Sequence, residues 1–510
     1  METQSDTLQL FGKLKSNKKV EDIKSAYYYA CPRRYPDNKK VVENLTDSTA
    51  ITSVNDAVKS MHNSIYPPFR QWIALVAETP VPDGEQSRFE KWLEEAEKKM
   101  SLAVELSNFH TEIDETLTDA MICEGALLLH EGPDENPFIF EAVPWDRFFS
   151  KMSFDKRPET NFFLRSASFN EIKYRWPKAT GLDILGKPGS NDLFEIVEAT
   201  IYDDLRDKYR YEVWLKDKNV CIYKEDDLDS SPWNIYRMGK QMYSEVGYGP
   251  VRDVLPDIKT LDKTQEMVLK NAAFAISGLW QADDDGVINP RTIKIVPGGI
   301  IPKSAGSKGL QPLETNRNFD VSQIIIADKS DKITKAIQGD KLPDASDGVR
   351  TAYEYSTRKE QAAKIEIPTV LRLAQPNAQL GRRMFAILSS PEKQGSPFYI
   401  KPFKYTPDGE FEEVTVKVKM ANPLIDLQKE IDKQKELQTL SAAMQLFGEL
   451  PLRMIQKSEY VRDYMVDNGF PVRRLRELDE VQKELAAEQQ AINEAKGRAL
   501  AEEESKNAKR

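Results

Sequence analysis

Acidic pairs come closest, among the residues of this chain, to a type and spacing that could do chemistry. Asp203-Asp204 and Asp226-Asp227 offer carboxylate oxygens, which are the ligands that hard divalent cations prefer. Asp283-Asp284-Asp285-Gly286 resembles part of a calcium loop, but the first and last ligand positions would fall on Gln281 and Thr292, which are not acidic. Paired acids in turns are usually only solvated, so we predict no metal site.

Other catalytic patterns are missing. Pro302-Lys303-Ser304 ends like a phosphate-binding loop but lacks the glycines that would cradle a phosphate. The histidines His62, His110 and His130 have no metal-ligand spacing and are too scattered for a triad, and we expect His62 and His130 on helix or loop surfaces. The three cysteines lie far apart and imply no disulfide framework. We therefore predict no catalytic residue and no cofactor, which favours a structural or transport role.

Composition limits the class of protein further. The chain has 510 residues, of which 40% are hydrophobic, so it can build real cores and divides into several domains. Its 72 Lys and Arg against 82 Asp and Glu give a net charge of -10. This balance excludes a basic protein that wraps nucleic acid, but not one that lets DNA slide past without gripping it. The sequence shows no apolar signal core and no apolar run of about 18 residues, so we expect no contact with a membrane.

Hydrophobic periodicity predicts a helical N-terminal region followed by a β-rich part. Residues 46–66 have apolar side chains at helical spacing, with Asp47 or Ser48 as a cap and Pro67-Pro68 as the end. Residues 89–130 are expected to be mostly helical. Alternating patterns then predict strands at 138–143, 193–202, 209–215 and 220–223.

Helix returns in the C-terminal half. We expect helices at 253–276, at 318–338 and at 349–388, the last interrupted at Pro368 and Pro376, with Gly- and Pro-rich turns between the first two. Residues 398–420 alternate as strands around a turn at 406–409, and 422–509 is nearly all helix, ending in a solvated tail.

Several segments, taken in order, resemble the portal (head-to-tail connector) proteins of short-tailed, podovirus-type bacteriophages. The most specific is Asp47-Ser48-Thr49-Ala50 followed by a helix, Pro67-Pro68 and Trp72. The other segments are listed here in chain order: Ala26 to Pro32, Glu124 to Leu129 with Val143-Pro144-Trp145, Gly278-Leu279-Trp280 with Val296 to Ile300, and Arg350 to Glu354 with Leu371-Arg372-Leu373.

The resemblance implies an α+β portal fold that forms a dodecameric ring at one capsid vertex of the virion. The implied parts are a wing at 1–252 (helical at about 41–130, β-rich at about 138–225), a first stem helix at 253–278, a clip at 279–317, a second stem helix at 318–338, a tunnel loop at 339–348, a long wing helix with returning strands at 349–421, and crown or barrel helices with a solvated tail at 422–510. The implied partners are double-stranded DNA bound without sequence specificity, the terminase large subunit, tail adaptor and nozzle proteins, and the major capsid and scaffolding proteins.

The resemblance also assigns residues to these parts. Lys329, Lys332 and Lys335 on the second stem helix and Lys341 in the tunnel loop would line the DNA channel. Spacing of three places the three helical lysines within about 120° of one another, although an ordinary solvated face with ion pairs would have the same pattern. The residues of the clip that would meet the motor and adaptor are Trp280, Arg291, Lys294 and Lys303; Trp280 also suits packing between neighbouring subunits.

Two other classes remain open at the level of sequence. One is a metal-dependent enzyme acting on nucleic acid through the acidic pairs, although no Lys or His cluster accompanies them. The other is a cytoplasmic scaffold with no role in DNA handling. A nicking assay with metal would separate the first from a portal protein, and a mass measurement would separate the second.

Overall fold

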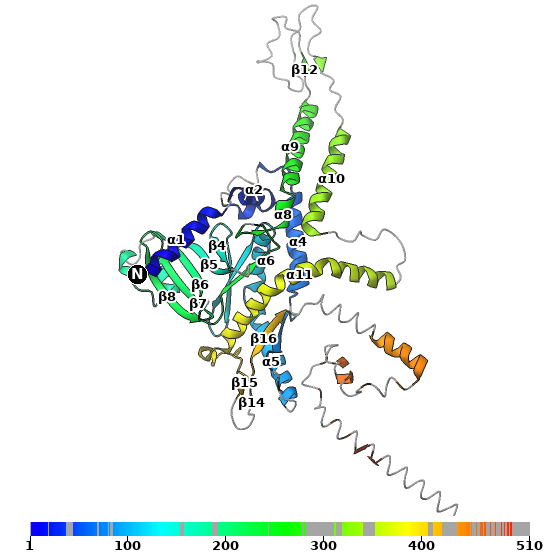
Figure 1. Cartoon of the computed structure of the whole chain (residues 1–510). Helices are drawn as coiled ribbons and strands as arrows, with labels where there is room; N and C mark the ends of the chain where they lie inside the picture. The colour runs from blue at the N-terminus through cyan, green and yellow to red at the C-terminus, as the bar shows by residue number, and fades with distance from the viewer. Residues whose placement is uncertain are drawn as a thin grey trace, which may run out of the picture.

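A computed structural model gives the fold (Figure 1). It describes residues 2–18, 20–36, 44–68, 71–79, 81, 85–153, 158–185, 192–203, 205–242, 244–277, 280–281, 311–312, 319–339, 352–405, 412–420, 436–448 and 450, with isolated positions between 455 and 491. Helices and strands are mixed, as the sequence predicts. Two helices project from the body of the molecule, and we call this pair, Leu255–Ser277 and Phe319–Gln338, the helical arm.

The N-terminal half contains most of the short helices. The helix predicted at 46–66 is confirmed, because Val54, Val58 and Ile65 are buried along one face and the helix ends before Pro67. The bounds are α1 (Glu2–Asn17), α2 (Val20–Ala30), a 3₁₀ turn (Pro32–Arg34), α4 (Thr49–Ile65), α5 (Gln86–Glu105), α6 (Phe109–Ala120), α7 (Phe169–Arg175) and a second 3₁₀ turn (Leu182–Leu185).

Two antiparallel sheets form the centre of the body. One has the strand order β3-β2-β9 and the other the order β4-β5-β6-β7-β8. The meander predicted from 193 to 223 is confirmed as β6, β7 and β8, and Asn219 takes the positive φ that the β7–β8 turn requires. The bounds are β2 (Gly125–Glu131), β3 (Phe138–Val143), β4 (Phe148–Met152), β5 (Pro158–Ser168), β6 (Leu193–Asp203), β7 (Lys208–Leu215), β8 (Val220–Leu228) and β9 (Trp233–Tyr236).

The prediction that 89–130 is mostly helical is wrong at its end. Residues Gly125–Glu131 form β2, the central strand between β3 and β9. The run Ala126-Leu127-Leu128-Leu129 is buried on both faces of that strand, so it lacks the alternation that would have marked it. His130 belongs to the same strand, so the expectation that it lies on a helix or loop surface is also wrong.

The C-terminal half supplies the arm and one very long helix. That helix, α11 (Ala352–Ser389), runs through both Pro368 and Pro376, so the expected interruptions are wrong, and Figure 1 shows it bending along its length. The remaining bounds are β10 (Gly239–Lys240), β11 (Gly247–Tyr248), α8 (Pro250–Asp253), α9 (Leu255–Ser277), β12 (Trp280–Gln281), β13 (Gln311–Pro312), α10 (Phe319–Gln338), a 3₁₀ turn (Pro391–Lys393), β14 (Lys404–Tyr405) and β15 (Glu412–Glu413).

Packing explains why α11 remains helical at its two prolines. An interior proline costs a helix about 3 kcal/mol relative to alanine. Leu373, Leu380 and Met384 around Pro376 are fully buried, and burying a large apolar side chain contributes about 1.5–3 kcal/mol. Tertiary burial therefore outweighs the local cost. The strand prediction at 398–420 is confirmed in its last part, where β16 (Val416–Met420) pairs with β1 (Ile73–Ala77) beside α11. Within 422–509, residues 436–447 are helical, as expected, and the rest of that prediction falls largely outside the described residues.

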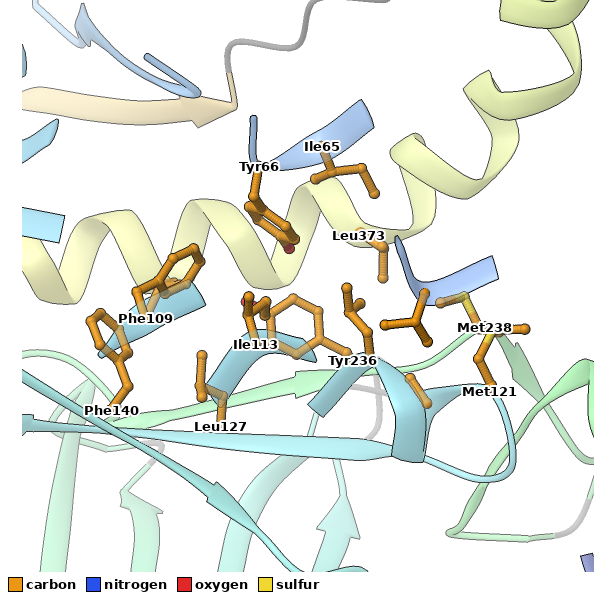
Figure 2. Close-up of a cluster of buried hydrophobic side chains, with 14 of the residues drawn as sticks. Ile65, Tyr66, Phe109, Ile113, Met121, Leu127, Phe140, Tyr236, Met238 and Leu373 are labelled. Atoms are coloured by element: carbon orange, nitrogen blue, oxygen red, sulfur yellow. The ribbon is translucent and has the colours of Figure 1, made fainter. Parts of the chain in front are cut away.

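The main core lies between α4, α6, α11 and the β3-β2-β9 sheet (Figure 2). The buried Trp72 stacks on Phe109 with ring centroids 5.2 Å apart, and Tyr66 meets both rings edge-on. Aromatic contacts of this kind add to the area that they bury. Leu373 brings α11 into the same cluster.

The N-terminal segment is built into this body. Tyr27 stacks on Trp145 with centroids 4.7 Å apart, which joins two of the segments that resemble portal proteins. Phe11 inserts between Phe149 and Phe162 on the five-stranded sheet. The buried Lys18 ammonium donates to the carbonyl oxygens of Trp145 and Phe148, which compensates its desolvation. Residues 2–18 and 20–36 therefore pack as part of the body.

Candidate functional site

The helical arm is fixed to the body at its base. The Thr46 hydroxyl and backbone N–H donate to Asp262 of α9. On α10, the hydroxyls of Thr334 and Ser53 lie 3.2 Å apart and share a hydrogen bond. Ile333 and Ile337 of α10 are buried against the body. These contacts set the direction in which both helices leave the body.

Farther from the base, the arm exposes large apolar side chains. Ile324 is 68% exposed and Ile325 43% exposed on α10, while Met267 and Leu269 are more than half exposed on α9. Exposed apolar side chains clustered on a projecting element are typical of surfaces that another molecule covers. The outer arm is therefore a candidate contact surface.

The three lysines assigned to the DNA channel do not form one free face. Lys329 reaches across the arm to Asp257 of α9. Lys332 and Lys335 are exposed and pair along α10 with Asp328 and Asp331, each four residues earlier. Only Lys332 and Lys335 are thus presented outward, each beside a carboxylate. The spacing predicted a charged face, and the packing of α9 on α10 turns Lys329 of that face towards α9.

Most of the other predicted site residues lie outside the described residues. These are Lys341, Arg291, Lys294 and Lys303. The backbone of Trp280 forms β12, which pairs with β13 directly beyond the arm, with Trp280 opposite Pro312. The calcium-like segment Asp283 to Gly286 and the phosphate-loop-like Lys303 also fall outside the described part.

The aspartates of the acidic pairs that the structure describes form ion pairs with Lys and Arg side chains of the protein. Asp226 pairs with Lys224 at 2.9 Å, and Arg206 lies 3.6 Å from Asp227 and 3.8 Å from Asp203. Among the described residues, no group of three or more His, Cys, Asp or Glu side chains is arranged to hold a metal ion. Nor does any helix among them have the length and apolar character needed to cross a membrane.

The cysteine thiols are unsuited to nucleophilic chemistry. Burial raises the pKa of Cys31 to about 12 and that of Cys123 to about 11. Since the thiolate is the nucleophile, both side chains are inert at neutral pH.

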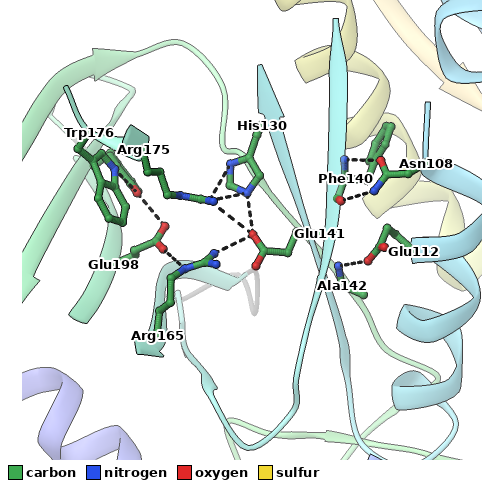
Figure 3. Close-up of polar contacts among 11 residues, drawn as sticks. Asn108, Glu112, His130, Phe140, Glu141, Ala142, Arg165, Arg175, Trp176 and Glu198 are labelled. Carbon is green, nitrogen blue, oxygen red and sulfur yellow. Dashed lines mark hydrogen bonds and ion pairs between the residues drawn. The ribbon is translucent and has the colours of Figure 1, made fainter. Parts of the chain in front are cut away.

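A charged network joins the two sheets (Figure 3). Arg165 on β5 donates to Glu141 on β3 at 2.7 Å and to the buried Glu198 on β6 at 2.8 Å. Tyr211 donates to the other oxygen of Glu198. Burial alone would raise the pKa of Glu141, but hydrogen bonds from His130 and Arg165 outweigh it and lower the pKa to about 2. The Glu141 carboxylate is therefore held in the charged form by fixed partners, which makes the network structural.

A second polar cluster, which the sequence did not indicate, joins α4 to α6. His62 is mostly buried rather than on the surface, and its Nε2 lies 2.9 Å from Nδ1 of His110. The Nδ1 atom of His62 meets Asp114, and Glu105 lies 3.6 Å from His110. Burial lowers the pKa of His110, although Glu105 opposes the shift. The two histidines are 48 positions apart in the sequence, so no local spacing could have paired them.

A buried amide holds the long helix against the body. Asn377, next to Pro376 in α11, accepts hydrogen bonds from the Tyr66 hydroxyl at 2.7 Å and from the Tyr236 hydroxyl at 3.0 Å. Tyr66 follows the end of α4 and Tyr236 lies on β9, so one side chain ties three elements together. These hydrogen bonds hold α11 at the point where Pro376 has no backbone N–H to donate within the helix.

No curated protein matches the sequence significantly. Among solved structures, a chain from the virion of a native gene transfer agent particle is 10% identical, with a TM-score of 0.37 over 79% of this chain and 90% of that chain. A chain from the neck of the native particle, computed with C12 symmetry, is 11% identical, with a TM-score of 0.36 over 86% of this chain and 94% of that one.

The family comparison covers almost the whole sequence. A profile described as bacteriophage head to tail connecting protein matches residues 5–475. The match includes the N-terminal helices, both sheets, the helical arm and α11. The chain therefore belongs to the bacteriophage head to tail connecting protein family.

Proposed function

We propose that this chain is a portal protein, a structural subunit of a dodecameric ring at one capsid vertex of a virion. Family membership over residues 5–475 carries the proposal. The helical arm supports it, because its outer half exposes Ile324, Ile325, Met267 and Leu269, which neighbouring subunits would cover. The subunit is made in the host cytoplasm, acts without a cofactor and is not an enzyme.

In this proposal the arm is the stem of the portal. Residues 253–278 and 318–338 are the two stem helices, 279–317 the clip, 339–348 the tunnel loop, 349–421 the long wing helix with its returning strands, and 422–510 the crown. Residues 1–252 form the wing. The clip, with Trp280, Arg291, Lys294 and Lys303, docks the terminase large subunit during packaging and a tail adaptor or nozzle protein afterwards. The wing meets the major capsid and scaffolding proteins.

Double-stranded DNA would pass through the centre of the ring. The net charge of -10 suits a channel that does not grip DNA, because few phosphates are neutralised and few counterions released. Lys332 and Lys335 already pair with aspartates, which weakens their attraction for phosphate further. Lys341 in the tunnel loop then provides the main contact, which is weak and depends on salt.

Labelling of particles tests the portal role. A gold-labelled antibody against this chain should bind a single vertex of each particle, where the tail joins. Label distributed over the whole capsid, or absent from particles, would contradict the proposal. Deleting residues 291–302 should then leave the ring intact and abolish packaging of DNA, whereas normal packaging would show that the clip is wrongly assigned.

A further inference from the structure

A cleft of about 450 Å³ lies between α11 and the end of β9 with the residues that follow it. One wall is formed by residues within 235–240 and the other by residues within 371–379 of α11. A cavity of this size is in the range of sites that take small organic molecules. The cleft contains none of the side chains that the proposed function assigns to DNA or to partner proteins, so its role is independent of that function.

The charged side chains of this cleft are all cations. Among the lining residues that the structure describes, Arg237, Lys240 and Arg372 are basic and none is acidic, although the chain as a whole has a net charge of -10. Arg237 is neutralised by its ion pair with Glu124, which does not line the cleft. Lys240 and Arg372 form no ion pair with any residue that the structure describes. Two positive charges are therefore available to an anion in the cleft.

These two charges lie at the same end of the cleft. Nη1 of Arg372 donates to the carbonyl oxygen of Met238 at 2.7 Å, and five residues farther along α11 Asn377 accepts from Tyr236. The helix and the strand thus run in opposite directions, which places Lys240 at the Arg372 end; Figure 2 shows Tyr236 and Met238 beside α11. A guanidinium that is fixed through one nitrogen keeps its other N–H groups for a phosphate or carboxylate.

Further hydrogen-bond donors line the rest of the cleft. Gln375 and Gln379 lie within about 60° of Arg372 around α11, so the three donor side chains follow one stripe about 10 Å long. On the opposite wall the side chain of Arg237 is only 10% exposed, and its Nε–H is buried without an acceptor among the described residues. Buried donors are normally paired, and a ligand oxygen in the cleft can supply the missing acceptor.

The remaining lining residues are apolar. Ile235, Met238, Leu371 and Pro376 belong to this part, and Leu371 is 60% exposed. An inorganic ion would leave these side chains uncovered, whereas the organic part of a larger ligand would cover them. The cleft thus combines a cationic end with an apolar wall.

We propose that this cleft binds a small organic phosphate, with the phosphate group on Arg372 and Lys240 and the organic part against Leu371 and Pro376. A phosphate monoester carries a charge of about −1.5 to −2 at pH 7, which matches two unpaired cations better than the single charge of a carboxylate does. Bound in this way, the ligand bridges α11 and β10 and stabilises the folded chain.

Equilibrium dialysis of the full chain with adenosine monophosphate tests the site. One molecule should bind per chain, and the melting temperature should rise with its concentration. Adenosine lacks the phosphate and inorganic phosphate lacks the organic part, so each should bind at least about tenfold more weakly.

Two variants, each with a matched control, locate the binding. Lys240→Gln removes an exposed charge, and Gln375→Glu places a carboxylate in the cleft without changing the shape of the side chain; each should weaken binding of adenosine monophosphate by about tenfold. Lys259→Gln and Gln438→Glu make the same exchanges at exposed positions outside the cleft and should bind like the parent.

Three results would overturn the site. One is that adenosine or inorganic phosphate binds as tightly as adenosine monophosphate. Another is that both cleft variants bind like the parent. The third is that duplex DNA binds through Lys240 while adenosine monophosphate does not, which would assign the two cations to DNA instead. A chain that forms no ring can still bind the phosphate, so failure of the proposed function is recognised separately, from the mass of the assembly.

Discussion

Lys329 of α10 binds the carboxylate of Asp257 on α9, which ties the two helices of the arm together 72 positions apart in the sequence. The pair explains why Lys329, which shares the three-residue spacing of Lys332 and Lys335, faces the other helix of its own arm. It also fixes the relative height of the two helices.

Removing this lysine should affect the arm rather than DNA. Lys329→Ala should lower the free energy of unfolding by about 0.5 kcal/mol, as for other partly exposed ion pairs, and leave the DNA length in purified particles unchanged. The double variant Lys332→Ala with Lys335→Ala should shorten or lose retained DNA, more so at high salt. Equal DNA loss in both variants would show that Lys329 faces the channel.

The amide of Asn377 is a second testable contact, since it is only 2% exposed and serves two tyrosine hydroxyls. Asn377→Leu would remove the acceptor of both buried hydroxyls, which could then bond only to each other, so one O–H would lack an acceptor and we expect a loss of about 2–4 kcal/mol in urea unfolding. Tyr66→Phe removes one hydrogen bond without adding an orphan hydroxyl and should cost about 1 kcal/mol. Comparable losses in the two variants would mean that the amide does not hold α11.

The network between the sheets should be sensitive to loss of its arginine. Arg165→Met leaves Glu198, 1% exposed, without its cation, so the free energy of unfolding should fall by about 3 kcal/mol. Arg206→Met is the control, because Arg206 is exposed and its loss should change stability by less than about 0.5 kcal/mol. An equally mild effect at Arg165 would refute the structural role of the network.

The histidine pair predicts a specific dependence of stability on pH. Burial lowers the pKa of folded His110 below its ordinary value of 6.5, so near and below pH 6.5 the unfolded chain binds a proton that the folded chain binds less well. This contribution to stability is complete above pH 6.5 and is lost as the pH falls from there towards the folded pKa. His62 and Glu105 contact the His110 ring, and Asp114 pairs with His62 beside it.

Urea unfolding between pH 8 and pH 5 measures this dependence. His110→Gln should flatten the curve below pH 6.5, because it removes the group whose pKa differs between the folded and the unfolded chain. A slope that is identical in the parent and in His110→Gln would contradict the assigned role of His110.

Hydrophobic periodicity predicts correctly those helices and strands whose buried side chains recur at the period of the element itself. The periodic Val54, Val58 and Ile65 of α4 and the alternating strands β6 and β7 are of this kind. The continuous apolar run Ala126 to Leu129 has no alternation of buried and exposed residues, so its sequence does not distinguish the strand β2 from a helix. Pro376 argued for a break in α11, but burial of Leu373 and Leu380 outweighs the proline.

The candidate site was predictable only in part, because its contacts join distant segments. The spacing of Lys329, Lys332 and Lys335 indicated a charged face, but only the packing of α9 on α10 decides which lysine turns inward. The same holds for His62 with His110 and for Asn377 with Tyr66 and Tyr236. Residue types can be read from a sequence, whereas partners across tertiary contacts cannot.

The mass of the purified protein in solution tests the central claim most directly. Native mass spectrometry, or light scattering after size exclusion, should give one closed assembly at a large multiple of the 58.2 kDa chain mass, twelvefold in the proposed ring. Such an assembly would cover the exposed apolar side chains of the outer arm. A chain that stays a 58.2 kDa monomer at every salt and protein concentration would contradict the portal assignment.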